Sequence, residues 1–310
     1  MKLRKFTHID LNTMKLWLAQ DYIQKYFGNP QEWIDEIAAN LDAEWVKYFI
    51  VEHNTPIGFV QYYETDIAPL GEWSDEPIGT VGIDYLIGNT NYLGKGYGTK
   101  IVTLLLDFIK TKKQYDYIVA DPITDNLASV KVLRNNGFEP KNNGLFVLDL
   151  NNNGIEIFRA NENDVEAITQ LFRDTIQNVN DKDYPPDEID DWSGWWTAHN
   201  KWKERIETQY FIKATFKNNV VGFSSLANDG YLDFMFTHKD YQRHGIAANL
   251  LSKIERKARL QGNKTIYSDV SLTAKGFFEK HGYIVEKQQL KRSKNKELVN
   301  FRMTKNIEQT

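Results

Sequence analysis

The sequence has no cysteine and no long apolar run, and each absence excludes a class of protein. Without cysteine among 310 residues, the chain has no disulfide framework, no thiolate metal site and no cysteine nucleophile. The mean hydropathy is −0.54, and no run reaches the ~18 apolar residues that a membrane helix needs. Polar residues follow the basic start where a signal peptide would be apolar. We therefore expect a cytoplasmic protein that is not associated with a membrane.

Excess charge of either sign is also missing. Lys and Arg total 38 and Asp and Glu total 42, a formal charge of −4, which argues against a generally basic nucleic-acid binder. The six histidines show no i, i+4 pairing of the kind that ligates a metal ion, and we expect no metal. Aromatic residues are what the chain has in abundance, with 8 Trp, 16 Tyr and 17 Phe. Four tryptophans fall in each half, which suggests an internal repeat.

The predicted elements occur in the same order twice. Each half reads as a strand, helices, a hairpin, a strand, a glycine turn and helix, then a strand, a helix and closing strands. Asp84 and Asp233 are 149 residues apart, and the same number separates Gly96 from Gly245. Several matches in one order indicate two copies of one domain.

The predicted domains are residues 1–152 and 153–310, joined by the turn-rich segment Asn151–Gly154. A length of about 150 residues each is typical of a single domain. Hairpins combined with helical connections predict a mixed α/β fold. We expect each domain to contain a mixed, mostly antiparallel sheet flanked by helices.

A short loop with glycine stands between a predicted strand and a predicted helix in each half. Backbone N–H groups and the positive end of the helix make such a turn an anion site, and glycine lets a phosphate approach the backbone. Taken alone, such a loop is more often a plain turn. It is neither a Walker A loop nor in the first strand–helix unit, where a dinucleotide fingerprint belongs. The loop residues are Leu93, Gly94, Lys95, Gly96, Tyr97, Gly98 and Thr99, and then Gln242, Arg243, His244, Gly245, Ile246, Ala247 and Ala248.

The segment Gln242–Ala247 fits the Q/R-x-x-G-x-G/A motif that binds acyl-CoA pyrophosphate, and the chain resembles the GNAT superfamily of N-acyltransferases. Ala274–Tyr283 is similar to the helix–strand segment that follows in that superfamily. In the first half, Leu93–Gly98 and Ala128–Phe138 hold the same places, although Leu93 replaces the usual Gln or Arg. The resemblance implies acetyl-CoA as co-substrate at both loops, with Asn126 contributing in the first domain.

The first half looks closer still to the aminoglycoside 6′-N-acetyltransferases, which implies a polycationic amine as acceptor. The second half resembles a different, less characterised GNAT branch through Asp183-Tyr184 and Phe277-Phe278, which implies no particular acceptor. The residues that carry the first resemblance are Lys15–Leu18, Pro56–Phe59, Gly82–Asp84, Tyr92–Lys100, Asp121-Pro122 and Asn126.

Acetyl transfer to an amine needs a base for the amine and a proton for the leaving thiolate. Asp84 is the candidate base, because it lies among apolar strand neighbours and the resemblance places an acceptor-binding aspartate there. Asp233 has the same 12-residue spacing to its loop and is the second candidate. The alternative is a strand carboxylate paired with a nearby cation.

Many GNAT enzymes protonate the thiolate with a tyrosine that this chain lacks. Alignment puts Leu133 and Phe278 at that position, and neither side chain can donate a proton. Water or another hydroxyl must serve instead, and those of Tyr85 and Tyr283 are the candidates.

The 47 residues between Lys47 and Lys95 contain seven acidic residues and no Lys or Arg. A cleft lined with one sign of charge concentrates ligands of the other sign, so this stretch favours a cationic acceptor, whereas a solvated acidic loop is the alternative. The acidic, Trp-rich segment 181–196 is either a second site wall or an exposed loop. The predicted acceptor-binding residues are Glu64, Trp73, Asp75, Glu76 and Asp121.

The sequence thus predicts an acetyl-CoA-dependent N-acetyltransferase that acts on an amine of a polycationic small molecule, an aminoglycoside 6′-amine, by direct attack in a ternary complex. Another amine is the alternative (a polyamine, an amino sugar or a peptide amine). A further alternative is one catalytic domain beside a structural or acyl-CoA-sensing one. Two such domains form a pseudo-dimer, so we expect a monomer or a homodimer.

Overall fold

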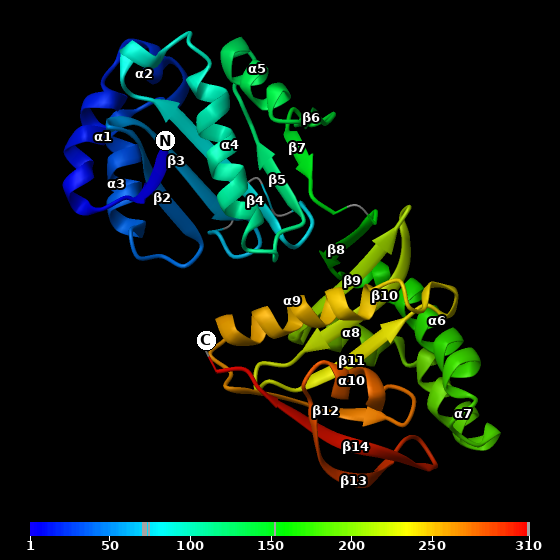
Figure 1. Ribbon diagram of the computed structural model, residues 1–310. Helices are drawn as coiled ribbons and strands as arrows, with labels where there is room; N and C mark the ends of the chain where they lie inside the picture. The colour runs from blue at the N-terminus through cyan, green and yellow to red at the C-terminus, as the bar shows by residue number, and fades with distance from the viewer. Residues whose placement is uncertain (70–72, 74, 152, 309–310) are drawn as a thin grey trace. The chain divides into compact units, whose positions relative to one another are not determined.

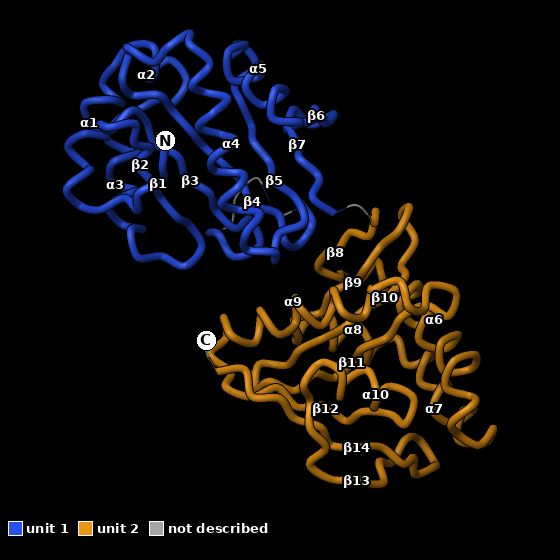
Figure 2. The backbone as a smooth tube through the Cα atoms, viewed as in Figure 1, with its two compact units in different colours: residues 1–152 blue, residues 153–310 orange. Residues whose placement is uncertain are grey.

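The chain divides into two compact units, Met1–Asn152 and Asn153–Thr310 (Figure 2). The computed structural model describes residues 1–69, 73, 75–151 and 153–308 (Figure 1). Asn152 of the expected boundary and Glu72 of the acidic stretch lie outside these residues. Throughout the described ranges, no helix combines the length and apolar character of a membrane span.

The first unit is built on a seven-stranded sheet in the order β1-β2-β3-β4-β5-β7-β6. Among its described strands, β4 and β5 pair in parallel, and the other neighbours are antiparallel. The sheet is therefore mixed and mostly antiparallel, as the hairpin and helix pattern predicts. The strands are β1 (Lys2–Lys5), β2 (Val46–His53), β3 (Thr55–Glu64), β4 (Thr80–Ile87), β5 (Tyr117–Ala120), β6 (Glu139–Pro140) and β7 (Phe146–Asp149).

In the described part of the first unit, three α-helices precede the β2–β3 hairpin, whereas the sequence pattern predicts two, at residues 11–18 and 31–41. The additional helix, α2, is seven residues long and has Ile23 as its one buried residue, so it gives almost no periodic signal. Gly28, with φ +67°, ends α2. The helices are α1 (Leu11–Leu18), α2 (Asp21–Phe27), α3 (Pro30–Asn40), α4 (Tyr97–Lys110) and α5 (Leu127–Asn135).

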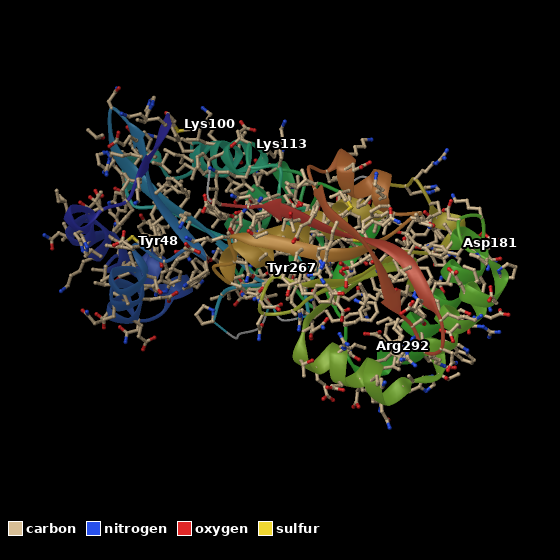
Figure 3. The ribbon with its side chains drawn as sticks, turned by 90° about the horizontal axis from the view of Figure 1, so that it is seen from below. Tyr48, Lys100, Lys113, Asp181, Tyr267 and Arg292 are labelled. Carbon is tan, nitrogen blue, oxygen red and sulfur yellow. The ribbon has the colours of Figure 1, made fainter. Side chains whose placement is uncertain are left out.

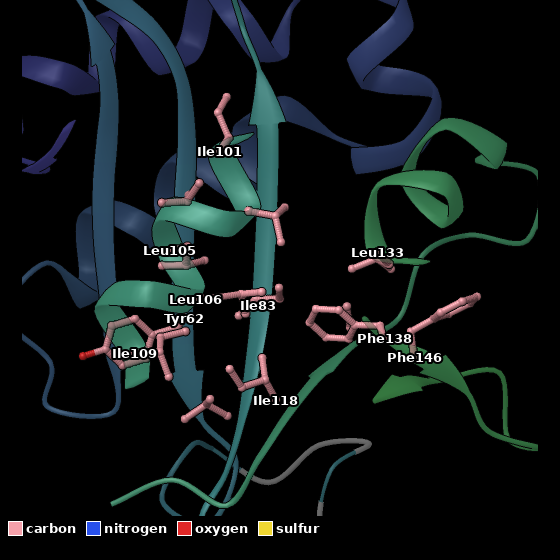
Figure 4. Close-up of a cluster of buried hydrophobic side chains, with 14 of the residues drawn as sticks. Tyr62, Ile83, Ile101, Leu105, Leu106, Ile109, Ile118, Leu133, Phe138 and Phe146 are labelled. Atoms are coloured by element: carbon pink, nitrogen blue, oxygen red, sulfur yellow. The ribbon is translucent and has the colours of Figure 1, made fainter. Parts of the chain in front are cut away.

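Strand alternation gives the sheet of the first unit two apolar faces. One core packs β4 residues such as Ile83 against α4 residues such as Leu105 (Figure 4). The other packs Leu86 of β4 together with residues of α1, α2 and α3. Because successive side chains of a strand point to opposite faces, Asp84 lies on the same face as Leu86, toward α1–α3.

The second unit repeats the element order but divides its strands into two sheets, β11-β10-β9-β8 and β12-β14-β13. A single parallel bridge, Tyr231 to Tyr267, stands where β4 and β5 pair in the first unit. The strands are β8 (Ile155–Arg159), β9 (Tyr210–Phe216), β10 (Asn219–Leu226), β11 (Leu232–Thr237), β12 (Thr265–Ser271), β13 (Ile284–Arg292) and β14 (Glu297–Asn306).

The acidic, Trp-rich segment of the second unit is helical from Pro186 onward, so the exposed-loop reading applies only to its first residues, 181–185. A five-residue π-helix, η4 (Ile176–Asn180), continues α6 (Val165–Thr175). It is followed by α7 (Pro186–Ser193), the 3-10 helix η5 (Gly194–Thr197) and α8 (His199–Thr208). The remaining helices are α9 (Ile246–Leu260) and α10 (Lys275–Lys280).

Candidate active sites

In each unit, two central strands separate beyond a short parallel contact. In the first unit, β4 and β5 pair only from Thr80 opposite Tyr117 to Gly82 opposite Val119. Where two strands separate, the backbone N–H and C=O groups on their facing edges no longer pair with each other. The twist of the sheet widens the gap between the strands. This separation opens a groove at the ends of the strands.

Each groove has an aspartate on both of its sides. Asp84 and Asp121 stand two residues beyond the last β4–β5 pair. In the second unit, Asp233 and Asp269 stand two residues beyond the Tyr231–Tyr267 bridge. Asp84 and Asp233 were candidates from their shared spacing to the glycine loops, and Asp121 from the family resemblance, whereas Asp269 was missed because no motif marks it. The structure therefore brings the predicted aspartates to corresponding places.

The groove of the first unit opens into a cavity of about 830 Å³. Three of the described lining residues are carboxylates, Glu36, Asp84 and Asp121, and the same described lining contains no Lys, Arg or His. Glu36 comes from α3 and was missed, since it lies outside the acidic stretch. Eight lining side chains are aromatic: Tyr22, Tyr26, Phe27, Trp33, Trp45, Tyr63, Trp73 and Tyr85.

Asp84 is held by one hydrogen bond from the neighbouring strand. Gln61 lies directly opposite in the β3–β4 register, and its Nε2 donates to Asp84 Oδ2 at 2.8 Å. Burial raises the pKa of Asp84 to about 7, and the charges of Asp121 and Glu36 act in the same direction against the hydrogen bond from Gln61. A carboxylate with this pKa can accept a proton near neutral pH. Gln61 Oε1 is buried in the cavity wall and has no hydrogen-bond partner among the residues that the structure describes.

The other expected acceptor-binding residues separate into two groups. Trp73 lines the cavity and packs on Tyr63, with ring centroids 5.9 Å apart. Glu64, Asp75 and Glu76 are outside the described lining. Glu64 is buried and accepts a hydrogen bond from Tyr115 Oη at 2.7 Å. Glu76 forms an ion pair with Lys141 at 3.4 Å, and Asp75 is exposed.

The proton-donor candidates also occupy different environments. Leu133 is fully buried in the core with α4, so this position does not face the cavity. Tyr85 lines the cavity, and its Oη lies 2.6 Å from Ser129 Oγ. Burial raises the pKa of Tyr85 to about 12, so its hydroxyl stays protonated. In the second unit, Phe278 lines the cavity, whereas Tyr283 is buried outside the described lining.

The first glycine loop forms the open start of α4. Gly94 and Gly96 have φ of +68° and +78°, a conformation that glycine adopts without the strain of other residues. Gly96 is the N-cap of α4 without a side-chain cap, and a Cβ at either glycine would meet no atom within 4 Å. Gly98 lies against α5, where an added Cβ would be 2.9 Å from Val132 Cγ2. The loop therefore leaves room for a large anion at its backbone.

Side chains fix this loop to its neighbours. Lys95 Nζ donates to the Asn91 carbonyl at 2.8 Å. Tyr97 packs edge-on against Tyr92 at 4.8 Å, and the Thr99 carbonyl accepts from Asn136 Nδ2 at 3.3 Å. Leu93, Gly98 and Asn126 line the cavity, and Asn126 Oδ1 caps α5 by accepting from Ser129 N at 3.1 Å.

The second loop repeats this geometry, but a residue other than glycine adopts one of its two left-handed conformations. Gly245, with φ +79°, is the N-cap of α9. Arg243, at the place of Gly94, also has a left-handed φ of +64°. Gln242 Nε2 donates to the Thr237 carbonyl at 2.7 Å, a brace that Leu93 cannot provide. His244 is exposed, with Nδ1 2.9 Å from the Gln242 carbonyl, and lies outside the described lining. The lining loop residues are Gln242, Arg243, Gly245, Ile246, Ala247 and Ala248.

The second cavity, of about 880 Å³, differs in charge from the first. Asp233 forms an ion pair with Arg205 and accepts a hydrogen bond from Gln209 Nε2 at 3.0 Å. Asp269 is paired with Lys291 and with Arg302. Although burial opposes it, these two cations lower the pKa of Asp269. Both groove carboxylates of the second unit are thus neutralised by basic side chains.

Metal ligands are not gathered at either groove. Within the described residues, no group of three or more His, Asp or Glu side chains is placed to hold a metal ion.

Comparison with known proteins gives one family for both units. A family model described as "Acetyltransferase (GNAT) domain" matches residues 7–146, and a second model with the same description matches residues 180–305. The first half resembles the aminoglycoside N(6′)-acetyltransferase type 1 of Klebsiella pneumoniae, at 28% identity over 148 residues, 44% of this chain and 73% of that protein. The uncharacterized N-acetyltransferase YafP of Escherichia coli K12 is 28% identical over 140 residues, 45% of this chain and 88% of that protein.

Solved structures with similarity to this chain each cover about half of it. A GCN5-related N-acetyltransferase from Rhodopseudomonas palustris is 25% identical, covers 48% of this chain and 94% of its own, and has a TM-score of 0.48. Aminoglycoside acetyltransferase AAC(6′)-Ib in complex with coenzyme A is 29% identical with the same two coverages and a TM-score of 0.44. On the two family matches, the chain belongs to the GNAT acetyltransferases and carries two such domains in tandem.

Proposed function

We propose that the first domain transfers the acetyl group of acetyl-CoA to a primary amine of a polycationic small molecule, with an aminoglycoside 6′-amine as the acceptor. The observation that carries the proposal is the position of Asp84 in a cavity whose described lining has three carboxylates and no basic side chain. The resemblance of the first half to an aminoglycoside N(6′)-acetyltransferase supports the same acceptor.

The charge of this cavity suits an acceptor with several ammonium groups. A pocket with carboxylates and no cation in its described lining attracts positive ligands and repels negative ones. Glu36 and Asp121 stand on elements other than that of Asp84, so they can contact different ammonium groups of one ligand. Gln61 Oε1 is buried without a partner in the described part of the chain, and it can accept a hydrogen bond from an ammonium or hydroxyl group. The aromatic lining offers faces on which sugar rings and cations bind.

The first glycine loop fits the phosphate groups of acetyl-CoA. The space around Gly94 and Gly96, together with the uncapped N–H groups at the start of α4, is what a pyrophosphate requires. Leu93 and Gly98 of this loop also line the cavity of Asp84. Acetyl-CoA bound there supplies the thioester next to the acceptor.

The side chains of the cavity can accept and donate the protons that a direct acetyl transfer requires. Asp84, with a pKa of about 7, orients the acceptor amine and takes the proton that the amine loses when its nitrogen bonds to the acetyl carbon. As the carbon–sulfur bond breaks, the Tyr85 hydroxyl donates a proton to the leaving sulfur and regains one through Ser129 and solvent. Backbone N–H groups of β4 beyond Gly82 can polarise the carbonyl.

Acetylation of kanamycin by the full-length protein, followed by the release of free CoA, tests the proposal. Glu36→Gln removes a cavity carboxylate and should raise KM about tenfold at low ionic strength with little change in kcat. The matched control is Asp35→Asn, the neighbouring α3 residue outside the described lining, which should leave KM unchanged. The assignment of the acceptor fails if spermidine or glucosamine gives a higher kcat/KM than every aminoglycoside in a panel.

A further inference from the structure

The cavity of the second domain has the charge of an anion site. Its two carboxylates, Asp233 and Asp269, are both engaged by basic side chains. Acetyl transfer to a polycation, as proposed for the first domain, is therefore disfavoured here. Besides His281, the described lining contains six Lys and Arg residues: Lys201, Arg205, Arg243, Lys280, Lys291 and Arg292.

These six divide between two walls. Arg243 belongs to the glycine loop before α9, where acetyl-CoA is expected, and Lys280 ends α10, in the segment Ala274–Tyr283 that follows this loop in the GNAT superfamily. We assign both to the co-substrate side of the cavity. Arg205 and Lys291 are occupied by the two carboxylates. The two remaining basic residues are Lys201 of α8 and Arg292, which ends β13 (Figure 3).

Lys201 and Arg292 lie on one connected wall of the cavity. Lys201 Nζ is 4.4 Å from the ring centroid of Trp195. The indole Nε1 of Trp195 donates to Ser293 Oγ at 3.2 Å, and Ser293 directly follows Arg292. Among the described residues, no carboxylate lies within 4.0 Å of either cation. The wall thus presents two positive charges without a negative partner in the described chain.

The same cavity also holds a polar group suited to an amine. Asn300 is 9% exposed and lines the cavity, and its Oδ1 has no hydrogen-bond partner within the described ranges. A buried amide oxygen without a partner is destabilising unless a ligand supplies the donor. Asn180, at the end of the π-helix, is fixed nearby by a hydrogen bond from its Nδ2 to Thr273 Oγ1 at 3.1 Å, and both residues line the cavity. Single π-turns of this kind are frequent at functional sites.

We propose that the second domain binds a small amine that also carries a carboxylate or phosphate group. Lys201 and Arg292 bind the anionic group, and Asn300 Oδ1 accepts a hydrogen bond from the amine. The inference rests on the proposed function in one respect, since it takes the second domain, like the first, to bind an amine acceptor next to acetyl-CoA. The two domains of one chain thereby have acceptors of opposite charge.

Binding to the full-length protein, saturated with CoA, tests this inference by calorimetry. The probes are two matched pairs, L-phenylalanine with phenethylamine, and glucosamine 6-phosphate with glucosamine. Within at least one pair, the anionic member should bind at least about tenfold more tightly, and added salt should reduce this preference. A preference in the first pair identifies the carboxylate as the recognised group, and one in the second pair identifies the phosphate.

A double variant and its matched control assign the preference to this wall. Lys201→Gln with Arg292→Gln should abolish it. The control is Lys203→Gln with Lys287→Gln. These residues lie on the same helix and strand but outside the described lining, so this variant should keep the preference for the anionic member. Equal binding of both members in each pair overturns the inference. So does a double variant that weakens CoA binding but keeps the preference, because its cations then serve the co-substrate. Failure of kanamycin acetylation would overturn the proposed function of the first domain without affecting this result.

Discussion

Replacing the proposed base should make the first domain more stable while it abolishes transfer. In Asp84→Asn the amide keeps an oxygen that accepts the hydrogen bond from Gln61, so the local geometry is retained. The variant lacks a group that can take a proton, and kcat should fall by about 10²–10⁴-fold. In the wild type, kcat/KM should rise with pH and level off above about pH 7, where Asp84 is ionised.

The stability change follows from the difference between the ordinary pKa of 3.8 and the value of about 7. A carboxyl group with a raised pKa binds its proton more tightly in the folded state. Its contribution to stability is complete below pH 3.8 and is lost as the pH rises to about 7. At about 1.4 kcal/mol for each factor of ten in proton affinity, the loss reaches up to about 4 kcal/mol. The asparagine variant does not ionise and escapes this loss.

Hydrogen exchange of the β3 and β4 amides in urea measures the effect in the first unit alone. The free energy of unfolding of Asp84→Asn should exceed that of the wild type by about 1.5 kcal/mol at pH 5 and by up to about 4 kcal/mol at pH 8. Asp107→Asn, an exposed carboxylate on α4, should change stability by less than about 0.5 kcal/mol at both pH values. The argument is that ionised Asp84 destabilises the folded protein. It is refuted if Asp84→Asn is no more stable than the wild type at pH 8, or if the increase in stability is the same at both pH values.

Three further substitutions examine the loops and the proton donor. Gly96→Ala should destabilise the first unit by about 1–2 kcal/mol, because its φ of +78° strains a residue with a Cβ, and calorimetry should show weaker acetyl-CoA binding; unchanged affinity would remove the loop from the co-substrate site. Arg243→Gly should stabilise the second unit by about 1 kcal/mol in urea unfolding, since φ is +64° there, yet reduce the acetyl-CoA affinity of its site; a loss of stability contradicts the strain argument. Tyr85→Phe should lower kcat at least about tenfold with KM preserved in steady-state kinetics, and a normal kcat assigns the proton to water.

The acidic stretch of the first half shows where sequence reasoning is incomplete. Linear density of charge suggested a single acidic wall between Lys47 and Lys95. In the structure, Glu64 is buried and accepts a hydrogen bond from Tyr115, and Glu76 forms an ion pair with Lys141. Of the described acidic residues in this stretch, only Asp84 lines the cavity. The other two cavity carboxylates come from outside the stretch. Charge along a chain does not fix which elements face each other.

The repeat of the element order, the glycine loops and the 12-residue spacing between each aspartate and its loop were readable from the sequence, because strands, turns and helices follow local backbone preference and side-chain period. Those signals located Asp84 and both loops. Tertiary structure alone decided the environment of the paired aspartates. Asp84 shares its cavity with Glu36, whereas Asp233 meets Arg205 of α8. These partners lie far away in sequence, and the packing of helices over the strand ends brings them together and gives two similar folds cavities of opposite charge.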